Sequence, residues 1–462
     1  MSRPLLFLLL LLFGSAGGPA SAADWPQFLG PAQDNTSPET GLLDRFPPGG
    51  PPVLWEQAIG SGYGAPSVRG DLLVLHHRRE DQEIVEAFDA RTGRSRWKYS
   101  YPSHFTDPFG YNNGPRCSPL LSETRCYTFG AEGVLLCLNL ADGKLVWRRD
   151  TGENDFDVPE AFFGVGASPV LEGNLLIVQV GGQPNSGIVA FDATTGKTVW
   201  QNVGEKTWTG VPMTGWPGER VVRWNPADPA FQKQASYSTP VLATIHGQRT
   251  LLCCTRQGLV SLDPATGAHR FSAWFRARQD NSVNAMAPVV SGDLVFISSA
   301  YYKTGSVVLR VHPDGMGADE VWRSTALEIH WSRPVLTAGH LFAFSGRDEP
   351  DAHFRCVRLS DGEVRWDRAE GWPNGGHSKI ASGEPMPNVF GRGWCILADG
   401  KLIALGEAGL LGIVRPNPEK LEEVCRWQVP HLVYPCWAGP VLAGKRLYLR
   451  SEDRLVCLDF AK

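Results

Sequence analysis

Three segments, "AFDARTGRSRW" (residues 87–97), "CLNLADGKLVW" (137–147) and "AFDATTGKTVW" (190–200), are close copies of one pattern. In each, the first three residues alternate as in a strand, and the third is Asp or Asn, whose side chain can bond the backbone two residues on. A glycine four positions later supplies a positive φ, and Trp follows four positions after that glycine. The pattern predicts a β-hairpin with a large aromatic residue at a fixed place.

Further copies extend the pattern along the chain. Residues 261–271 keep the spacing with Phe271 in the aromatic position, and residues 356–366 keep the glycine and Trp366 but place Arg358 at the start of the turn. Weaker copies end at Trp322 and Trp427. About thirty residues before each copy, a proline precedes an apolar strand. These prolines are Pro66, Pro119, Pro169, Pro240, Pro288, Pro334, Pro387 and Pro440.

The proline intervals are mostly 46 to 53 residues, with one interval of 71 that contains an insertion. Four antiparallel strands repeated at this period are typical of a propeller blade, so the sequence predicts an all-β, eight-bladed β-propeller. The last unit lacks a closing Trp strand, whereas "PPVLWEQAIG" (51–60) has Trp55 in a matching context. We therefore expect the N-terminal strand to complete the final blade.

The chain begins with Arg3, an apolar run from Leu5 to Phe13 and the small residues Ala20-Ser21-Ala22. This layout predicts a signal peptide (1–22), a single propeller domain (23–462) and an exported, soluble protein, periplasmic or secreted. The first cysteine is Cys117, so no lipid anchor is expected near the cleavage site, and no later run is long enough for a membrane span. The net charge of −4 gives no general attraction for nucleic acid.

The "A-x-D-x-x-T-G-x-x-x-W" copies and the proline-initiated strands resemble the PQQ-like β-propeller repeat family. That family includes the quinoprotein alcohol dehydrogenases and the BamB-type scaffold proteins of outer-membrane assembly. The opening "DWPQFLGP" (24–31) resembles the start of many exported bacterial members of unassigned function. The resemblance implies the fold but leaves the function open, because many functions share one fold.

The quinoprotein dehydrogenases combine PQQ and calcium with a base carboxylate and, in many members, a disulfide between adjacent cysteines. Cys253-Cys254 is an adjacent pair here, but it lies within a strand, so we interpret it as buried strand cysteines, with a disulfide as the alternative. A bridge between Cys126 and Cys137, which flank one hairpin, is a further alternative. No catalytic residue and no metal ligand is assigned.

The crossovers that lead from each outer strand to the next inner strand are expected to meet around the mouth of the central channel. A concave, partly apolar funnel with a few polar groups is the usual form of a ligand site. The polar and aromatic candidates in these crossovers are Asn113, Arg116, Tyr237, Asn284, His330, Trp331, Arg333, His377, Tyr434 and Trp437.

Residues 201–237 form an insertion with three tryptophans, Trp208, Trp216 and Trp224, which could cover the channel, dock a partner or form a local core. The favoured function is a non-catalytic binding or scaffold protein that takes a protein or a small-molecule ligand on its top face. The alternative is an alcohol or sugar dehydrogenase that uses PQQ and calcium on the same face.

Overall fold

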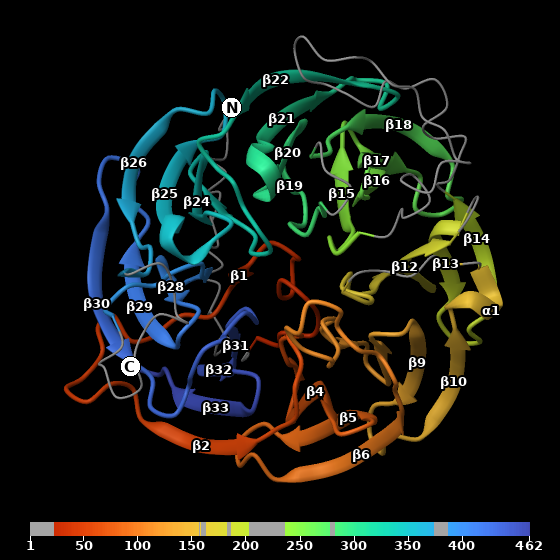
Figure 1. Cartoon of the computed structure of the whole chain (residues 1–462), viewed down its shortest axis with the longest axis horizontal. Helices are drawn as coiled ribbons and strands as arrows, with labels where there is room; N and C mark the ends of the chain where they lie inside the picture. The colour runs from red at the N-terminus through yellow and green to blue at the C-terminus, as the bar shows by residue number, and fades with distance from the viewer. Residues whose placement is uncertain are drawn as a thin grey trace, which may run out of the picture.

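The computed structural model describes residues 23–462 apart from 157, 159–162, 183–185, 203–235, 278–281 and 374–386. Within this part of the chain, eight sheets, antiparallel except for one parallel pair in the seventh, stand around a central axis like the blades of a propeller (Figure 1). The prediction of an all-β, eight-bladed propeller is confirmed. Helical structure in the described residues is limited to α1 (Glu153–Phe156) and the 3-10 turns η1 (Tyr301–Lys303) and η2 (Glu349–Asp351).

We number the blades along the chain, and each blade's strands run from the axis outward. Blades one to four are β3 (Ser67–Arg69), β4 (Leu72–Arg79), β5 (Gln82–Asp89), β6 (Ser95–Pro102); β7 (Leu120–Leu121), β8 (Arg125–Phe129), β9 (Val134–Asn139), β10 (Leu145–Asp150); β11 (Val170–Glu172), β12 (Leu175–Gly182), β13 (Ser186–Asp192), β14 (Thr198–Asn202); β15 (Val241–Ile245), β16 (Gln248–Cys254), β17 (Gly258–Leu262), β18 (His269–Trp274).

Blades five to eight, with β1 and β2 from the N-terminal end, are β19 (Val289–Ser291), β20 (Leu294–Ser299), β21 (Gly305–Val311), β22 (Ala318–Ser324); β23 (Val335–Thr337), β24 (His340–Ser345), β25 (His353–Arg358), β26 (Val364–Ala369); β1 (Thr36–Ser37), β27 (Trp394–Ala398), β28 (Lys401–Leu405), β29 (Leu410–Arg415), β30 (Glu422–Gln428); β31 (Val441–Ala443), β32 (Arg446–Arg450), β33 (Arg454–Asp459), β2 (Val53–Ala58).

The ring is closed by pairing between the two ends of the chain. β2 is the outer strand of blade eight and pairs antiparallel with β33, which places Trp55 opposite Cys457. The expected N-terminal closure is therefore confirmed. Figure 1 shows β2 beside β33 at the junction with blade one.

Blade seven departs from the predicted pattern. In the other blades the innermost strand begins directly after its proline, but β27 begins at Trp394, well beyond Pro387. Its inner edge is occupied by β1, which pairs parallel with it and sets Thr36 opposite Leu397. Pro387 therefore does not start the inner strand, and blade seven has a fifth strand that the repeat pattern did not predict.

The repeat motif forms the joint between neighbouring blades. The indole Nε1 of Trp97 in blade one donates to the carbonyl of Leu140 in blade two at 2.9 Å. A Cβ on Gly143, the turn glycine of blade two, would lie 2.4 Å from the same ring. Equivalent indole bonds are Trp55 to Ala90, Trp147 to Ala193, Trp200 to Pro264, Trp322 to Leu359 and Trp366 to Asn417. The turn glycines Gly93, Gly196, Gly267 and Gly362 likewise leave room for the tryptophan of the preceding blade.

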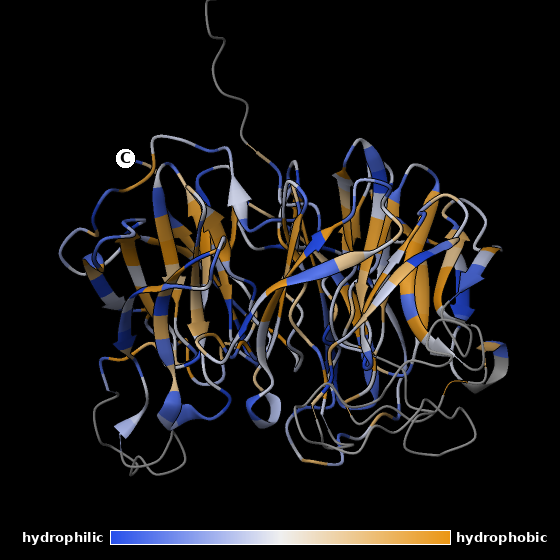
Figure 2. Cartoon of the chain, turned by 90° about the horizontal axis from the view of Figure 1, so that it is seen from above, coloured by the Kyte–Doolittle hydropathy of each residue, from blue (hydrophilic) through white to orange (hydrophobic). Residues whose placement is uncertain are grey.

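The strand interiors are apolar, as Figure 2 shows, and all ten cysteines are free thiols. Cys253 and Cys254 are buried in blade four, so the interpretation of this pair as strand cysteines holds. The alternative of a Cys126–Cys137 bridge is wrong. Cys126 pairs with Leu138, and Cys137 pairs with Tyr127, so the two cysteines are one position out of register and lie on opposite faces of the sheet.

Residues 24–37, here called the plug, cross the axis of the ring (Figure 1). Trp25 pairs with Val68 in blade one, and the carbonyl of Pro26 accepts from the amide of Leu121 in blade two. Leu29 packs in a cluster with Val241 of blade four. "DWPQFLGP" (24–31) is therefore a structural element that closes the channel at one end.

The far end of the plug is fastened to blades six and seven. The amide Nδ2 of Asn35 donates to the carbonyl of Arg333 at 2.9 Å, and the carbonyl of Asn35 accepts from the amide of Leu397. Asn35 has φ 64°, a backbone conformation that Asn tolerates better than most residues.

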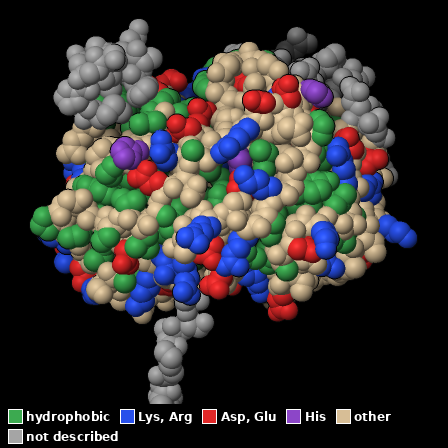
Figure 3. Space-filling view, turned by 90° about the horizontal axis from the view of Figure 1, so that it is seen from below, with side chains coloured by type: hydrophobic (Ala, Val, Ile, Leu, Met, Phe, Trp, Pro, Cys, Tyr) green, Lys and Arg blue, Asp and Glu red, His purple; other side chains and the backbone are tan. Residues whose placement is uncertain are grey.

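Acidic and basic side chains are interspersed over the side of the ring seen in Figure 3, with no large area of one sign. Among the described residues, no helix has the length and apolar character needed to cross a membrane.

Candidate functional site

The plug and the crossovers enclose a cavity of about 530 Å³ on the axis, here called the cup. Every one of the eight crossovers contributes to its wall. In chain order the crossover residues are Tyr63, Tyr111, Arg116, Phe163, Gly166, Tyr237, Val283, Ala285, His330, Trp331, Arg392, Tyr434 and Trp437. Phe28 of the plug and Trp394 of β27 also line the cup, and their rings meet edge to face with centroids 5.9 Å apart.

Aromatic rings form a nearly continuous wall around the cup. Trp331 and Trp437 lie with ring centroids 5.0 Å apart, and the ring centroid of Tyr63 lies 4.9 Å from that of Trp437. From Trp331 the contacts continue through His330 to Tyr301. A second series of ring contacts runs from Trp437 to Tyr111, Phe163 and Tyr237.

The structure brings six of the ten sequence candidates to the cup, namely Arg116, Tyr237, His330, Trp331, Tyr434 and Trp437. Three others, Asn113, Asn284 and Arg333, lie outside the lining and bond to neighbouring backbone. Asn113 uses its side chain to accept from the amide of Asp107. Asn284 is buried and donates to the carbonyls of Thr255 and Phe275. His377 lies outside the described residues.

Arg333 lies beneath the cup against the plug. Its guanidinium donates to the carbonyl of Pro288 at 3.1 Å, and its own carbonyl accepts from Asn35. Burial lowers the pKa of Arg333 to about 10. Arg333 therefore joins blades five and six to the plug and presents no group to a ligand.

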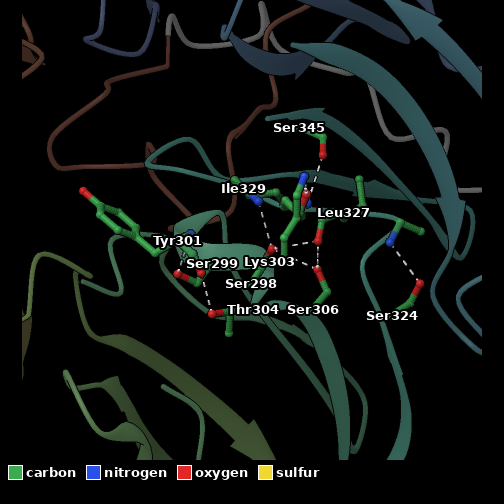
Figure 4. A network of polar contacts seen from close by, with 12 residues as sticks. Ser298, Ser299, Tyr301, Lys303, Thr304, Ser306, Ser324, Leu327, Ile329 and Ser345 are labelled. Carbon is green, nitrogen blue, oxygen red and sulfur yellow. Dashed lines mark hydrogen bonds and ion pairs between the residues drawn. The ribbon is translucent and has the colours of Figure 1, made fainter. Parts of the chain in front are cut away.

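The crossover that carries His330 and Trp331 is held by the polar network in Figure 4. Ser306 Oγ donates to the carbonyl of Leu327 at 2.7 Å, and the amide of Ile329 donates to Ser298 Oγ at 3.0 Å. The amide of Glu328 donates to Ser345 Oγ of blade six at 2.9 Å. Backbone and hydroxyl groups thus fix the crossover from both blades, which positions the two aromatic rings at its end.

Both arginines of the lining are paired with buried carboxylates outside it. Arg116 bonds Asp107 at 2.6 Å. Arg392 bonds Glu407 at 2.9 Å, and Glu407 also accepts from the indole of Trp437 at 3.0 Å. The guanidinium of Arg392 lies 4.9 Å above the ring of Trp331. The charge of each arginine is therefore balanced by a carboxylate within the protein.

His330 is neutral over the ordinary pH range. Burial lowers its pKa to about 3, and the neighbouring cations Arg392 and Arg347 act in the same direction. Its Nε2 lies 3.3 Å from the hydroxyl of Tyr301. Burial also raises the pKa of Tyr237 to about 12 and that of Tyr434 further, with Glu349 contributing at Tyr434.

Several lining residues were missed by the sequence reasoning. Tyr63 lies in "SGYGAP", the crossover that precedes the inner strand of blade one. It therefore has the same position in its repeat as the candidates taken from the other crossovers. Tyr301 and Glu349 lie in turns between the second and third strands of their blades, so the crossover rule could not reach them. Phe28 belongs to the plug, for which the repeat pattern gives no signal.

The described residues do not supply the donors that PQQ with calcium would need. No group of three or more His, Cys, Asp or Glu side chains placed to hold a metal is found among them. The adjacent cysteines lie in β16 and not in the lining of the cup. The two lining arginines already have carboxylate partners.

The fold and the cup define a PQQ-like eight-bladed propeller with a plugged central channel. The chain belongs to the family described as outer membrane protein assembly factor BamB, whose profile matches residues 81–368. No curated protein matches the sequence.

Solved structures share the fold at low identity. A quinohemoprotein alcohol dehydrogenase from Comamonas testosteroni is 12% identical with a TM-score of 0.61, covering 95% of this chain and 81% of its own. A europium-containing methanol dehydrogenase is 12% identical with a TM-score of 0.61, covering 94% and 89%. BamB from Moraxella catarrhalis is 15% identical with a TM-score of 0.52, covering 88% and 98%. These neighbours include both functional classes considered above and do not separate them.

Proposed function

We propose that this protein is an exported, non-catalytic binding propeller that takes up a small molecule in the cup. The observation that carries the proposal is the aromatic wall to which all eight crossovers contribute, above a floor made by the plug. A cavity of about 530 Å³ has the size and the apolar character typical of small-molecule sites. The arginines nearest the ligand space are paired with carboxylates, so their charge is balanced within the protein.

The test is a titration of the purified mature protein, followed by tryptophan fluorescence and by calorimetry. The ligands are choline, a neutral sugar, and PQQ with and without calcium. We expect saturable binding of at least one probe, with a change in the emission of the tryptophans in the wall. Ala285→Trp, which adds bulk to the lining, should abolish that binding, while Ala141→Trp in an exposed turn of blade two should leave it intact.

Two results would contradict the proposal. If no probe binds, the cup is not a site for these small-molecule classes and the search moves to protein partners. Calcium-dependent binding of PQQ together with alcohol-dependent dye reduction would instead establish the dehydrogenase alternative.

A further inference from the structure

We propose that Glu39 binds the α-ammonium group that forms on Ala23 when the chain is cleaved between Ala22 and Ala23. This inference rests on the export that is part of the proposed function, but not on ligand binding in the cup. It follows from the contact that closes the plug into a loop, and from a buried carboxylate for which the described residues supply no cation.

The residues that flank the two ends of the plug meet each other. The plug pairs with blade one at Trp25 and with blade seven at Ser37. Ala23 directly precedes the plug, and Glu39 follows it by two residues. Oε1 of Glu39 accepts a hydrogen bond from the backbone nitrogen of Ala23 at 3.1 Å. This contact joins residues 16 positions apart and closes the plug into a loop.

The carboxylate of Glu39 is held in place by blade eight. Its Oε1 also accepts from the amide of Gly444 at 2.5 Å, and its Oε2 accepts from the amide of Lys445 at 2.6 Å. Both amides belong to the turn between β31 and β32. Glu39 is only 5% exposed. The two backbone bonds therefore fix a buried carboxylate directly beside the nitrogen of Ala23.

This buried carboxylate lacks a counter-ion. Among the described residues, no Lys, Arg or His side chain forms an ion pair with Glu39, whose partners are three backbone nitrogens. The side chain of Lys445 is exposed, and its Nζ lies beside Gly41, where an added Cβ would be 2.9 Å from it. A buried charge without an opposite charge is costly, because amide groups replace its lost hydration only in part. An ammonium group on Ala23 supplies the missing positive charge.

Hydrolysis of the peptide bond before Ala23 creates this group on the atom that already contacts Glu39. Water breaks the C–N bond, the carbonyl carbon of Ala22 takes the oxygen and becomes a carboxylate, and both hydrogens of the water end on the nitrogen of Ala23. The small residues Ala20-Ser21-Ala22 match the pattern that a leader peptidase cleaves. A neutral hydrogen bond to Glu39 is thereby replaced by a charge-assisted one, which is the stronger kind.

Cleavage therefore fastens the floor of the cup. Phe28 of the plug lines the cup, and the plug begins at the residue after Ala23. With an amide at Ala23, Glu39 remains a buried charge without a cation. With an ammonium group there, an ion pair joins the start of the plug to blade eight. The processed chain thus holds its plug more firmly than the precursor does.

The first experiment identifies the N-terminus of the exported protein. The full chain is produced in a bacterial host, and the exported product is examined by intact mass and N-terminal sequencing. We expect Ala23 as the first residue. A product that is not cleaved, or that begins at Asp24 or at any other residue, overturns the inference.

The second experiment measures how fast the α-amine of Ala23 is acylated in the folded, processed protein, by mass spectrometry of the N-terminal peptide. Acylation needs the neutral amine, which a neighbouring carboxylate disfavours, so the rate should be at least about tenfold lower in the wild type than in Glu39→Gln. Glu123→Gln is the matched control, because Glu123 is exposed in the turn between β7 and β8, the equivalent inner turn of blade two. It should react at the wild-type rate.

A third experiment changes the charge on the Ala23 nitrogen without any substitution. A chain that keeps residues 17–22 ahead of Ala23 has an amide at this position. Its folding equilibrium constant should be about tenfold lower than that of the processed chain, the size expected for a hydrogen bond between charged groups. In the Glu39→Gln background the same extension should change the constant by less than about twofold. If Glu39→Gln does not fold, the comparison of the two wild-type chains still decides.

The outcomes separate this inference from the proposed function. Equal acylation rates in the wild type and Glu39→Gln overturn it, as does an extension that costs no stability or costs the same in both backgrounds. Ligand binding in the cup is measured independently by the titration described above. A cup that binds no probe in a protein with the Ala23–Glu39 pair removes the proposed binding function alone, and a cup that binds a ligand in a protein without this pair removes this inference alone.

Discussion

Trp97 of blade one donates its indole N–H to the carbonyl of Leu140 across 2.9 Å, and Leu140 lies in the turn of the next blade. The ring of Trp97 is buried and packs with apolar residues of both blades. This joint recurs around the ring, so it sets the angle between neighbouring blades.

Trp97→Ala should destabilise the protein by about 3–5 kcal/mol, because the large buried ring is lost and a cavity remains at the joint. Unfolding in guanidinium chloride measures the change. Arg94→Ala, in the exposed turn of the same hairpin, should alter stability by no more than about 0.5 kcal/mol. Equal effects of the two substitutions would show that the ring does not hold the joint.

Gly143→Ala should be clearly more destabilising than Gly70→Ala. Both glycines have positive φ, 70° and 56°, so both substitutions strain the backbone by about 1 kcal/mol. Only at Gly143 does the added Cβ meet a ring, that of Trp97, at 2.4 Å, whereas nothing lies within 4 Å of a Cβ at Gly70. The difference between the two melting temperatures isolates the steric part of the joint. A difference of zero would mean that the ring moves aside without cost.

Acidification should destabilise the wall of the cup through His330. Its pKa is about 3 in the folded protein and about 6.5 when unfolded, so the unfolded chain binds more protons between these values. Stability contributed by neutral His330 is complete above pH 6.5 and is lost as the pH falls, by about 3 kcal/mol at pH 4. His330→Gln should therefore show a weaker dependence of unfolding free energy on pH across this interval. If the unfolding free energy of the variant depends on pH as steeply as that of the wild type, groups other than His330 cause the dependence.

Ten thiols should be countable by alkylation and mass spectrometry after unfolding without reductant, because no two cysteines are bridged. In the native protein, labelling of Cys126, Cys253 and Cys254 should be slow, since each is buried and burial raises the pKa of its thiol. A mass lower by two hydrogens after unfolding would reveal a disulfide and contradict the free-thiol arrangement.

The fold could be predicted from the sequence because one hairpin and one joint recur in blade after blade, and the recurrence marks the strands. The crossover candidates reached the cup for a topological reason, since chains leaving outer strands must return toward the axis. Residue type alone could not separate lining from support. Asn284 turns its amide to backbone carbonyls, whereas Tyr237, in the preceding crossover, points its ring into the cavity.

The plug was beyond prediction for another reason. Its contacts join Asn35 to Arg333 and Leu397, partners some three hundred or more positions away in the chain. No local pattern encodes such pairing. The position of β1 could not be predicted for the same reason, because its two residues pair with blade seven only when the plug has crossed the axis.

The contact between the tryptophan of one blade and the turn of the next blade also has a consequence for how the number of blades can change during evolution. Most repeats contribute one tryptophan that packs against the following repeat and one glycine that makes room for the tryptophan of the preceding repeat. The N-terminal segment obeys the same rule at the seam, because Gly50 faces Trp427 and Trp55 reaches Ala90. Duplication of one whole repeat would therefore add a donor and a recipient together, so blade number could change without the invention of a new interface.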